Sequence, residues 1–232
     1  MSTPHFPFVS QYEYPPKGEE MAQTLLCITL DSADTTQRIA KQMRQTHQPH
    51  VYGPVIPKKL PATDDRVLLM QNKLEADTQM HVALPFKSKH NMQFNSMSKS
   101  PSWNADFYND LVGPVLHQGL VVETWEHAGT AIPGATTGDK HKIVCPLTVN
   151  LEPLAAKIGW KNPFDHAKLA ITDKAQHQAT EPRYVCVGDI NFTNTMQKRG
   201  GGTVAFVSVD LWTPLDAILI ERTPPKSGTT AT

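Results

Sequence analysis

The sequence predicts one α/β domain, a layered α-β-α sandwich built on a mixed sheet. Short apolar stretches typical of strands alternate along the chain with stretches of helical periodicity. Several of the strand-like stretches are apolar throughout, which favours a sheet inside a sandwich. With 232 residues, of which 39% are apolar, the chain can bury one substantial core.

The N-terminal part of the chain predicts a lead-in followed by a βα unit. Four prolines in residues 1–22 favour an extended segment that lies along the surface. The domain itself is expected to span residues 23–222, and it should open with a buried strand at 23–31. A helix is then predicted to run to about Thr46, with Ser32 or Asp34 as its N-cap.

The later elements follow from the same patterns. Further strands are predicted at residues 67–70, 81–86, 120–125, 143–151 and 203–209. Asn104 is the expected cap of a helix whose Phe107 and Leu111 face the core. A last amphipathic helix is expected at 210–221, and the Pro/Ser/Thr-rich tail at 223–232 should be disordered.

Residues 87–100 form a polar stretch for which two interpretations stay open. A solvated loop is the more frequent case for such a composition. The alternative is a rim that contacts nucleic-acid phosphates through its lysines Lys87, Lys89 and Lys99.

His166 is the only one of the ten histidines that is followed two positions later by a lysine. On a β-strand, side chains two positions apart project to the same side, about 6 to 7 Å apart. The surrounding residues 164–171 are compatible with a strand that carries His166 and Lys168 at one end. An imidazole and an ammonium would then share one pocket, although a His-x-Lys pair also occurs by chance in many chains.

A second cluster of polar residues follows about twenty positions later. Residues 184–191 predict a β-branched strand that ends in a turn. If the two strands are neighbours, Asp189 and Asn191 can face the same pocket as the histidine. Arg199 then places a cation beside three glycines, whose backbone can approach a ligand closely. The simpler interpretations are an Asx-type turn and a flexible loop.

Together these side chains indicate phosphoryl transfer that needs neither a metal nor another cofactor. His166 can attack a phosphodiester or protonate its leaving oxygen, since an ordinary histidine pKa of about 6.5 makes both forms available. Lys168 would neutralise the non-bridging oxygens in the transition state. Asn191 would hydrogen-bond either the phosphate or the imidazole.

The same part of the chain resembles the C-terminal signature of the deoxyribonuclease II family, in which a DHxKW strand precedes WxCxGDxNR and RGGGT. This chain has Asp-His-Ala-Lys at 165–168, Cys-Val-Gly-Asp-Ile-Asn at 186–191 and Arg-Gly-Gly-Gly-Thr at 199–203. Likeness to the family also lies in residues 22–30, 107–111 and 120–125. The resemblance covers most of residues 1–220.

The resemblance implies a phospholipase D-like fold and a metal-independent DNA endonuclease. In that superfamily two His-x-Lys motifs face each other across one active site; one histidine forms a phosphohistidine and the other acts as general acid and base. By this likeness the products would end in 3′-phosphate and the optimum would be acidic. His166 would be nucleophile or general acid and Lys168 the phosphate clamp. Asn191 with Asp189 would orient these groups, and Arg199 would contact the substrate.

The chain departs from the family pattern at several points. It holds no second His-x-Lys, so the other half-site is expected from a missing N-terminal segment, another polypeptide or a second copy in a homodimer. Leu169 stands where the family has tryptophan, Phe192 where it has arginine, and Ala205 where many relatives have cysteine. The alternative function is a catalytically incomplete fragment that keeps the fold and binds DNA; a phospholipase is supported only at superfamily level.

Overall composition sets the remaining limits. The 22 basic and 22 acidic residues give a formal net charge of zero, so contact with DNA needs a local patch. No stretch of the sequence is apolar enough for a membrane span or a signal-peptide core. Cys27, Cys145 and Cys186 have apolar neighbours and predict buried free thiols, which favours a reducing compartment, whereas family members are typically lysosomal or secreted.

Overall fold

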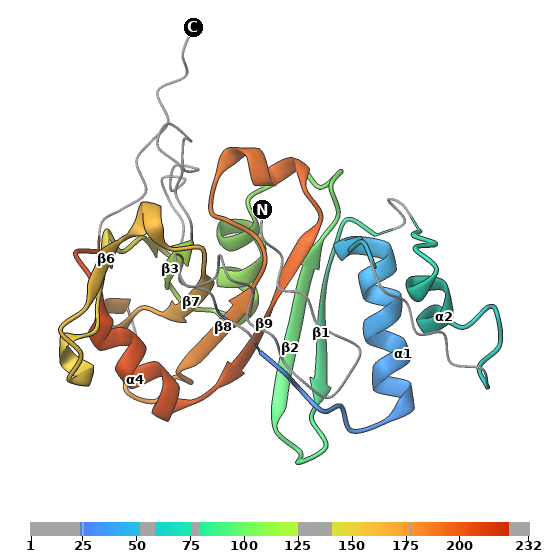
Figure 1. The fold of residues 1–232 in the computed structure, drawn as a ribbon, viewed down its shortest axis with the longest axis horizontal. Coiled ribbons are helices and arrows are strands. Elements are labelled where there is room, and N and C mark those ends of the chain that lie inside the picture. The colour runs from blue at the N-terminus through green and yellow to red at the C-terminus, as the bar shows by residue number, and fades with distance from the viewer. Residues whose placement is uncertain are drawn as a thin grey trace, which may run out of the picture.

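The computed structural model describes residues 24, 26–51, 59–75, 79–124, 141–176 and 178–222. Among these residues, a seven-stranded sheet in the order β1-β2-β9-β8-β7-β3-β4 forms the centre (Figure 1). Its strands are β1 (His81–Lys87), β2 (Gln93–Lys99), β3 (Leu120–Thr124), β4 (Ile143–Val144), β7 (Lys168–Thr172), β8 (Tyr184–Gly188) and β9 (Gly201–Val207). The β3–β4 pair is parallel and the other neighbours are antiparallel. The predicted α/β class with a mixed sheet is therefore confirmed.

A smaller sheet and short helices complete the described part of the chain. The smaller sheet contains β5 (Thr148–Asn150), β6 (Gly159–Lys161) and β10 (Leu219–Ile220) in the order β10-β5-β6. The α-helices are α1 (Ala33–Gln42), α2 (Asp65–Met70), α3 (Gly113–Leu116) and α4 (Val209–Ile218). Single π or 3₁₀ turns are η2 (Met43–His47), η3 (Tyr108–Val112), η4 (Glu152–Leu154), η5 (Asn162–Phe164), η6 (Lys174–Gln176) and η7 (Asn194–Lys198). The lead-in predicted for 1–22 and the tail predicted for 223–232 lie outside the described residues.

Both faces of the main sheet are buried, because apolar side chains alternate between its two sides. One face, formed by Leu120, Val122, Ala170, Cys186 and Ala205, packs against the helical segment of η3 and α3. The other face, formed by Val121, Leu169, Ile171, Val185 and Phe206, packs against α4, the small sheet and residues of α1. This double burial explains why the central strands are apolar throughout.

Helix α1 confirms the prediction of a helix after residue 31. Ser32 is its N-cap, and the Ser32 hydroxyl accepts a hydrogen bond of 3.1 Å from the Thr35 amide. The helix continues into the π turn η2 and ends where Gln48 adopts a left-handed conformation, with φ of 52°. A π turn was not predicted, and His47 is its last residue.

The helical segment that begins at Phe107 has a different cap from the one predicted. Asp106, rather than Asn104, accepts hydrogen bonds from the backbone amides of Tyr108 and Asn109, at 3.0 and 2.7 Å. Burial raises the pKa of Asp106 to about 6, although these amides oppose the shift. Phe107 and Leu111 are buried as predicted.

Some of the predicted elements are wrong. Residues 67–70 belong to α2 instead of a strand, because a short apolar run cannot distinguish the two and Asp64 caps the helix by accepting from the Arg66 amide. Residues 93–99 lie in the polar stretch interpreted as a solvated loop or a phosphate-contacting rim, and they form β2, which pairs with both β1 and β9. The burial of Phe94 and Met97 supplies the apolar contacts that this strand needs.

The expected strand at 23–31 is also incorrect for the described residues. Leu30 makes only an isolated bridge to Ser88, and residues 26–29 are not paired in a sheet. Leu26 and Ile28 nevertheless pack against the second face of the main sheet. The alternation of apolar residues in this segment therefore arises because the segment packs against the sheet, although it is not one of the strands.

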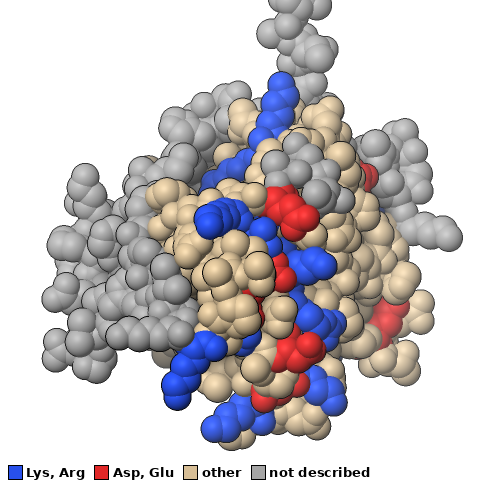
Figure 2. Space-filling model, turned by 90° about the vertical axis from the view of Figure 1, so that its right-hand side faces the viewer, with Lys and Arg blue, Asp and Glu red and all other residues tan. Residues whose placement is uncertain are grey.

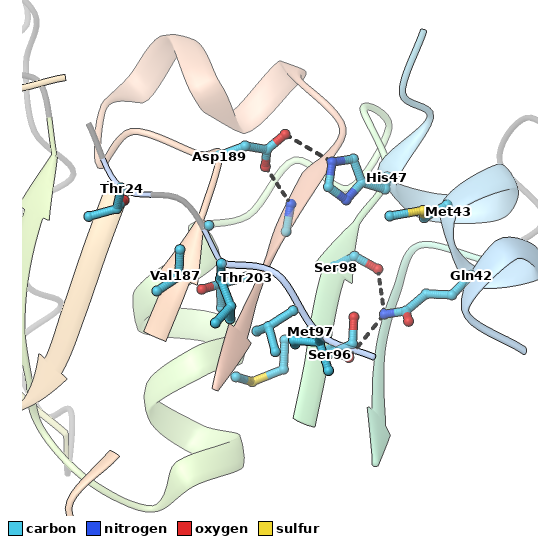
Figure 3. A pocket seen from close by; sticks show the side chains of 15 residues that line it. Thr24, Gln42, Met43, His47, Ser96, Met97, Ser98, Val187, Asp189 and Thr203 are labelled. Atoms are coloured by element: carbon cyan, nitrogen blue, oxygen red, sulfur yellow. Dashed lines mark hydrogen bonds and ion pairs between the residues drawn. The ribbon is translucent and has the colours of Figure 1, made fainter. Parts of the chain in front are cut away.

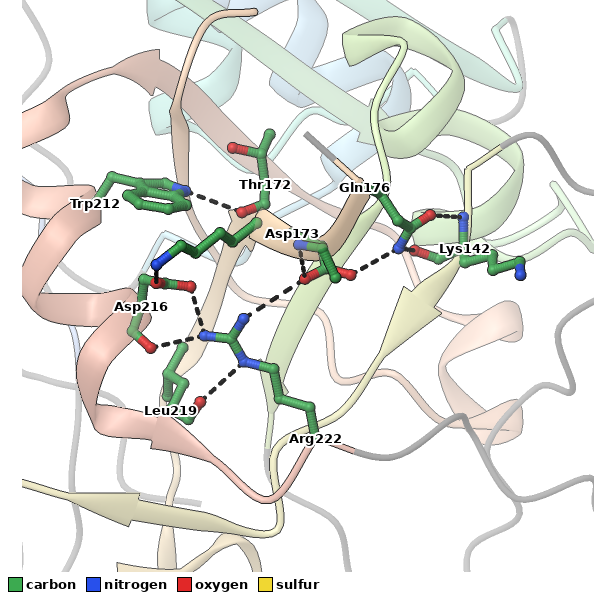
Figure 4. Close-up of polar contacts among 10 residues, drawn as sticks. Lys142, Thr172, Asp173, Gln176, Trp212, Asp216, Leu219 and Arg222 are labelled. Carbon is green, nitrogen blue, oxygen red and sulfur yellow. Dashed lines mark hydrogen bonds and ion pairs between the residues drawn. The ribbon is translucent and has the colours of Figure 1, made fainter. Parts of the chain in front are cut away.

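Helix α4 is fixed to one end of β7 by polar contacts (Figure 4). The Trp212 indole nitrogen donates to the Thr172 carbonyl at 2.9 Å. Arg222 donates to a carboxylate oxygen of Asp216 at 2.7 Å and lies 3.5 Å from that of Asp173. The side chains of Thr172 and Asp173 thus lie at the opposite end of β7 from Lys168.

Among the described helices, none has both the length and the apolar character of a membrane span.

The three cysteines differ in their surroundings. Cys145 and Cys186 are buried free thiols, as predicted, whereas Cys27 is exposed. Burial raises the pKa of Cys186 to about 12, so its thiol is inert at neutral pH.

Candidate active site

His166 and Lys168 meet at the beginning of β7. The sequence predicted that both residues lie on one strand, but β7 starts at Lys168 and His166 lies just before it. The Lys168 ammonium turns back and donates a hydrogen bond to the backbone carbonyl of His166. The two side chains are therefore held in one region by a local contact.

Asp165 fixes the turn that carries His166. One of its carboxylate oxygens accepts from the Ala167 amide at 2.8 Å, and the other accepts from the Trp160 indole at 2.7 Å. Asp165 is buried, and Trp160 lies on β6 of the small sheet. The small sheet thus anchors the histidine from one side.

Thr124, at the end of β3, connects the two stretches that the sequence singled out. In the sheet register Thr124 is opposite Lys168. Its carbonyl accepts from the side-chain amide of Asn162 at 2.9 Å, and its hydroxyl accepts from the amide of Phe192 at 2.9 Å. The turn before β7 and the turn after β8 are therefore tied to the same residue.

Asp189 lies directly after β8, next to the glycine run that opens β9. Its carboxylate accepts from the Gly202 amide at 2.8 Å. A Cβ atom on Gly201 would lie only 2.6 Å from that carboxylate, and one on Gly200 would lie 2.7 Å from the backbone carbonyl of His47. The sequence predicted that these glycines let the backbone approach a ligand, whereas here they let it approach the protein's own groups.

His47 completes this side of the site, and the sequence analysis did not identify it. Its Nε2 atom lies 2.9 Å from the Asp189 carboxylate, which is also 4.0 Å from the guanidinium of Arg199. Figure 3 shows the His47 ring and the Asp189 carboxylate facing each other from the helix side and the sheet side of a cavity. The two residues are 142 positions apart, so no local pattern could have linked them.

The cavity beside this pair has a volume of about 230 Å³. Its wall includes His47 and Asp189 as polar groups, together with apolar side chains from Met43, Met97 and Val187. The cavity therefore offers an apolar surface next to an ionisable pair.

The charges of the site alter one another. Burial lowers the pKa of Lys168 to about 8; Arg199 lowers it further, while Asp165 and Asp189 act in the opposite direction. Burial, and then the charge of Lys168, lowers the pKa of His166. Charged groups from both stretches therefore act on the pKa of Lys168, which indicates that the two stretches interact electrostatically.

Asp189 shows how strongly its neighbours favour the carboxylate. Burial by itself would raise the pKa of Asp189. His47, the Gly202 amide and Arg199 outweigh that effect, so the pKa is lowered. Asp189 is therefore ionised over a wider pH range than an ordinary aspartate.

Asn191 is buried behind this turn. Its Oδ1 atom has no hydrogen-bond partner among the described residues. The preceding residue is fixed, because the Tyr108 hydroxyl donates to the Ile190 carbonyl at 2.7 Å. This amide oxygen can accept a hydrogen bond from an imidazole or a substrate group.

The three lysines of the predicted rim do not lie together. Lys99 is fully buried, and its ammonium donates to the carbonyls of Gln197 and Arg199 at 2.7 and 2.8 Å. Burial lowers the pKa of Lys99 to about 8. Lys87 and Lys89 are exposed near the hairpin turn, at the other end of β2 and roughly 20 Å from Lys99 by strand length. Lys99 thus supports the loop that carries Arg199.

Charge on the face formed by α1 and α2 is mixed. Figure 2 shows Lys and Arg side chains interspersed there with Asp and Glu. Arg44 pairs with Asp65, and Arg66 pairs with Asp64 at 2.7 Å. The described residues of this face therefore carry charges of both signs side by side. No group of three His, Cys, Asp or Glu residues suited to a metal ion occurs among the residues that the structure describes.

Comparison with known proteins adds a further finding. The family profile described as "Deoxyribonuclease II" matches residues 1–224. A protein named "Putative deoxyribonuclease-2" from Burkholderia thailandensis is 37% identical over 210 residues, which are 90% of this chain and 57% of that protein. "Deoxyribonuclease-2" of Caenorhabditis elegans is 32% identical over 95% of this chain and 56% of its own length, and "Plancitoxin-1" of Acanthaster planci is 28% identical over 90% and 56%. The chain spans a little more than half the length of these relatives.

Proposed function

The chain belongs to the deoxyribonuclease II family, and on that premise we propose that it hydrolyses DNA phosphodiester bonds through His166. The observation that carries this proposal is the convergence of two separate stretches at one end of the sheet. His166 and Lys168 come from the first stretch, and Asp189 and Arg199 come from the second. A phospholipase D-like fold is part of the same proposal, which the mixed, doubly covered sheet supports.

His166 is the nucleophile in the proposed reaction. Attack requires a neutral imidazole, and burial together with Lys168 favours this form by lowering the pKa of His166. A bond forms between an imidazole nitrogen and phosphorus, and the bond from phosphorus to the 5′-oxygen breaks. The products then end in 3′-phosphate once water has hydrolysed the phosphohistidine.

Lys168 and Arg199 stabilise the charge that develops on the phosphoryl oxygens. The ammonium of Lys168 is adjacent to the histidine, and the guanidinium of Arg199 is about half exposed. Cations fixed in this way lower the free energy of the transition state as negative charge develops on the phosphoryl oxygens. The proposed chemistry therefore draws its positive charge from side chains and is independent of added metal. Lys87 and Lys89 would contact only DNA that extends along the sheet.

The leaving 5′-oxygen needs a proton, which a nucleophilic His166 cannot supply at the same time. One source is a second His-x-Lys, provided by a second copy of this chain or by a polypeptide segment beyond this sequence. Sedimentation of the purified chain checks the first case, since it requires a species of twice the chain mass under assay conditions. A monomer that cleaves DNA would contradict it.

Plasmid cleavage in EDTA tests the main proposal. The wild-type chain and the His166→Ala variant are compared between about pH 4 and about pH 8, a range that brackets the ordinary histidine pKa. We expect cleavage that is strongest at acidic pH and absent in the variant, with unchanged unfolding by denaturant. Cleavage that persists in His166→Ala would contradict the proposal. No cleavage by the wild type would favour a catalytically incomplete, DNA-binding protein.

A further inference from the structure

An exposed aromatic residue, Phe164, precedes the proposed nucleophile by two positions. Phe164 is 65% exposed, the largest value among the large apolar residues that the structure describes. The other described phenylalanines are all buried: Phe86, Phe94, Phe107, Phe192 and Phe206. A single exposed apolar side chain is common on protein surfaces and needs no explanation by itself. What distinguishes Phe164 is its place beside His166, on a turn that is fixed at both of its ends.

Two buried residues fix the ends of this turn, η5. The side-chain amide of Asn162 donates to the Thr124 carbonyl at 2.9 Å, and the Asn162 carbonyl accepts from the Asp165 amide at 2.9 Å. Asn162 and Asp165 are only 1% and 3% exposed. Pro163, which lies between them, has a φ angle fixed by its own ring. The backbone of Phe164 is therefore held in one place while its ring lies in solvent.

The backbone between Phe164 and His166 directs their side chains to the same side. Asp165, the residue between them, is extended, with φ of −102° and ψ of 119°. Its carboxylate points into the protein, where the Ala167 amide and the Trp160 indole donate to it. The side chains that flank an extended residue project away from it, and Cα atoms two residues apart are separated by about 7 Å at most. A phosphate at His166 therefore brings one of its two flanking nucleosides within reach of the Phe164 ring.

The surroundings of the ring suit a nucleic-acid strand. Lys161, which precedes the turn, is exposed and can place its ammonium against a neighbouring phosphate. Lys168 supplies a second cation on the other side of His166. Aromatic side chains between such cations stack on bases of any sequence, because every base has a π face. An apolar ring next to positive charge thus fits a partner that alternates phosphates with planar rings.

We propose that Phe164 stacks on a nucleobase next to the phosphate that His166 attacks, and so positions the DNA strand for cleavage. This inference rests on the proposed function and adds a substrate contact to it. Stacking requires an open face of the base, so this base is separated from one of its neighbours in the bound DNA. Phe164 contacts the substrate but takes no part in making or breaking bonds.

A thymidine hexanucleotide tests the proposal when its central linkage is the only ordinary phosphodiester and the others are phosphorothioates, which resist cleavage. For Phe164→Ala we expect KM to rise by roughly 5- to 150-fold. The value of kcat should change little, since the ring touches neither the nucleophile nor the leaving oxygen. Two further hexanucleotides each lack one of the bases that flank the central linkage. Wild type should lose a similar factor on one of them, whereas Phe164→Ala should be insensitive to that deletion.

Two other substitutions separate stacking from apolar contact in general. Phe164→Trp keeps a π face and should keep the wild-type KM. Phe164→Leu keeps an apolar side chain without a π face, so its KM should rise as in Phe164→Ala. Leu211→Ala is the matched control, because Leu211 is 50% exposed on α4, beyond the end of β9 that lies opposite to the glycine run. It should leave both kinetic constants unchanged.

NMR provides a readout that needs no turnover. When the hexanucleotide binds the His166→Ala protein, the ring current of Phe164 should shift the protons of the stacked base upfield. The shift should be absent in the protein that carries both His166→Ala and Phe164→Ala.

The outcomes separate the two proposals. An unchanged KM in Phe164→Ala, or equal sensitivity of both proteins to deletion of the base, would overturn the stacking and leave the nuclease proposal intact. A wild-type KM in Phe164→Leu would show apolar contact without stacking, and would also overturn it. A wild-type protein that cleaves neither plasmid nor hexanucleotide, but shows the upfield shift that depends on Phe164, would refute the proposed function and keep the stacking.

Discussion

The two stretches that form the candidate active site are stabilised in different ways. Residues 165–168 are held mainly by near neighbours: Asp165 accepts from the Ala167 amide, and Trp160 is only five positions away. Residues 188–202 are held by contacts that span the chain, such as the bond between His47 and Asp189.

This difference shows what each stretch contributes. The first stretch presents a nucleophile and a cation on a turn that its own sequence largely defines. The second stretch brings a carboxylate, a guanidinium and a distant histidine together, and it does so through glycines that leave no room for side chains. Substitutions in the first stretch should therefore lower the rate of cleavage directly. Substitutions in the second stretch should lower it by disturbing the packing that holds the charged groups in place.

After the loss of cleavage expected for His166→Ala, the next largest effect is expected for Lys168→Met in the first stretch. Methionine keeps the length of the stem but removes the positive charge beside the phosphoryl group. We expect the rate of DNA cleavage to fall by roughly 100- to 1,000-fold, with little change in stability. Initial rates on plasmid DNA measure this, and Lys174→Met serves as control, since the Lys174 side chain is 72% exposed at the other end of β7. A loss of less than tenfold would remove Lys168 from the proposed chemistry.

Gly200→Ala tests the packing of the second stretch. The added Cβ would lie 2.7 Å from the carbonyl of His47 and 2.9 Å from that of Thr46, so backbone must move. We expect the free energy of unfolding to fall by about 1 to 3 kcal/mol and DNA cleavage to fall with it. Urea unfolding gives the first quantity and plasmid assays the second.

Gly113→Ala is the matched control for that change. Its nearest contacts would be at 3.3 Å, and alanine favours the helix in which residue 113 lies. Its unfolding free energy should change by less than about 1 kcal/mol. Equal destabilisation by the two substitutions would mean that Gly200 has no special role.

Trp160→Phe tests how the first stretch depends on the small sheet. The substitution removes the indole donor at 2.7 Å and leaves an oxygen of buried Asp165 without its partner. A stability loss of about 1 to 3 kcal/mol is expected, together with reduced cleavage. Trp212→Phe also loses an indole hydrogen bond, to the Thr172 carbonyl. It should be destabilised without a change in kcat, and a parallel loss of kcat in both would refute the anchoring role of Trp160.

The smallest expected effect is a shift in the pKa of His166 when Lys168 is replaced. Burial comes first and the charge of Lys168 second in lowering the pKa of this histidine. In Lys168→Met the imidazolium is no longer repelled, so the pKa of His166 should rise and the acidic limb of the rate profile should move to higher pH. NMR titration of the His166 ring protons measures this in both proteins. An unchanged or lower pKa would show that the two side chains do not interact.

Several elements were predictable because their causes are local. Ser32 caps α1, the central strands are apolar on both faces, and the mixed sheet follows from strands that alternate with helices. Errors arose where local patterns are ambiguous. Residues 67–70 are too few and too uniformly apolar to distinguish a helix from a strand, and the polar composition of 93–99 hid a strand whose Phe94 and Met97 are buried.

The sequence by itself determined the chemical groups of the candidate site and their local order. His166 precedes Lys168 by two residues, and Asp189 precedes Asn191 by two, whatever the fold. Tertiary structure alone decided that the buried ammonium of Lys99 donates hydrogen bonds to the carbonyls of Gln197 and Arg199. It also decided that His47 would meet Asp189, because contacts between residues 142 positions apart arise from sheet order and helix packing, which no local spacing encodes.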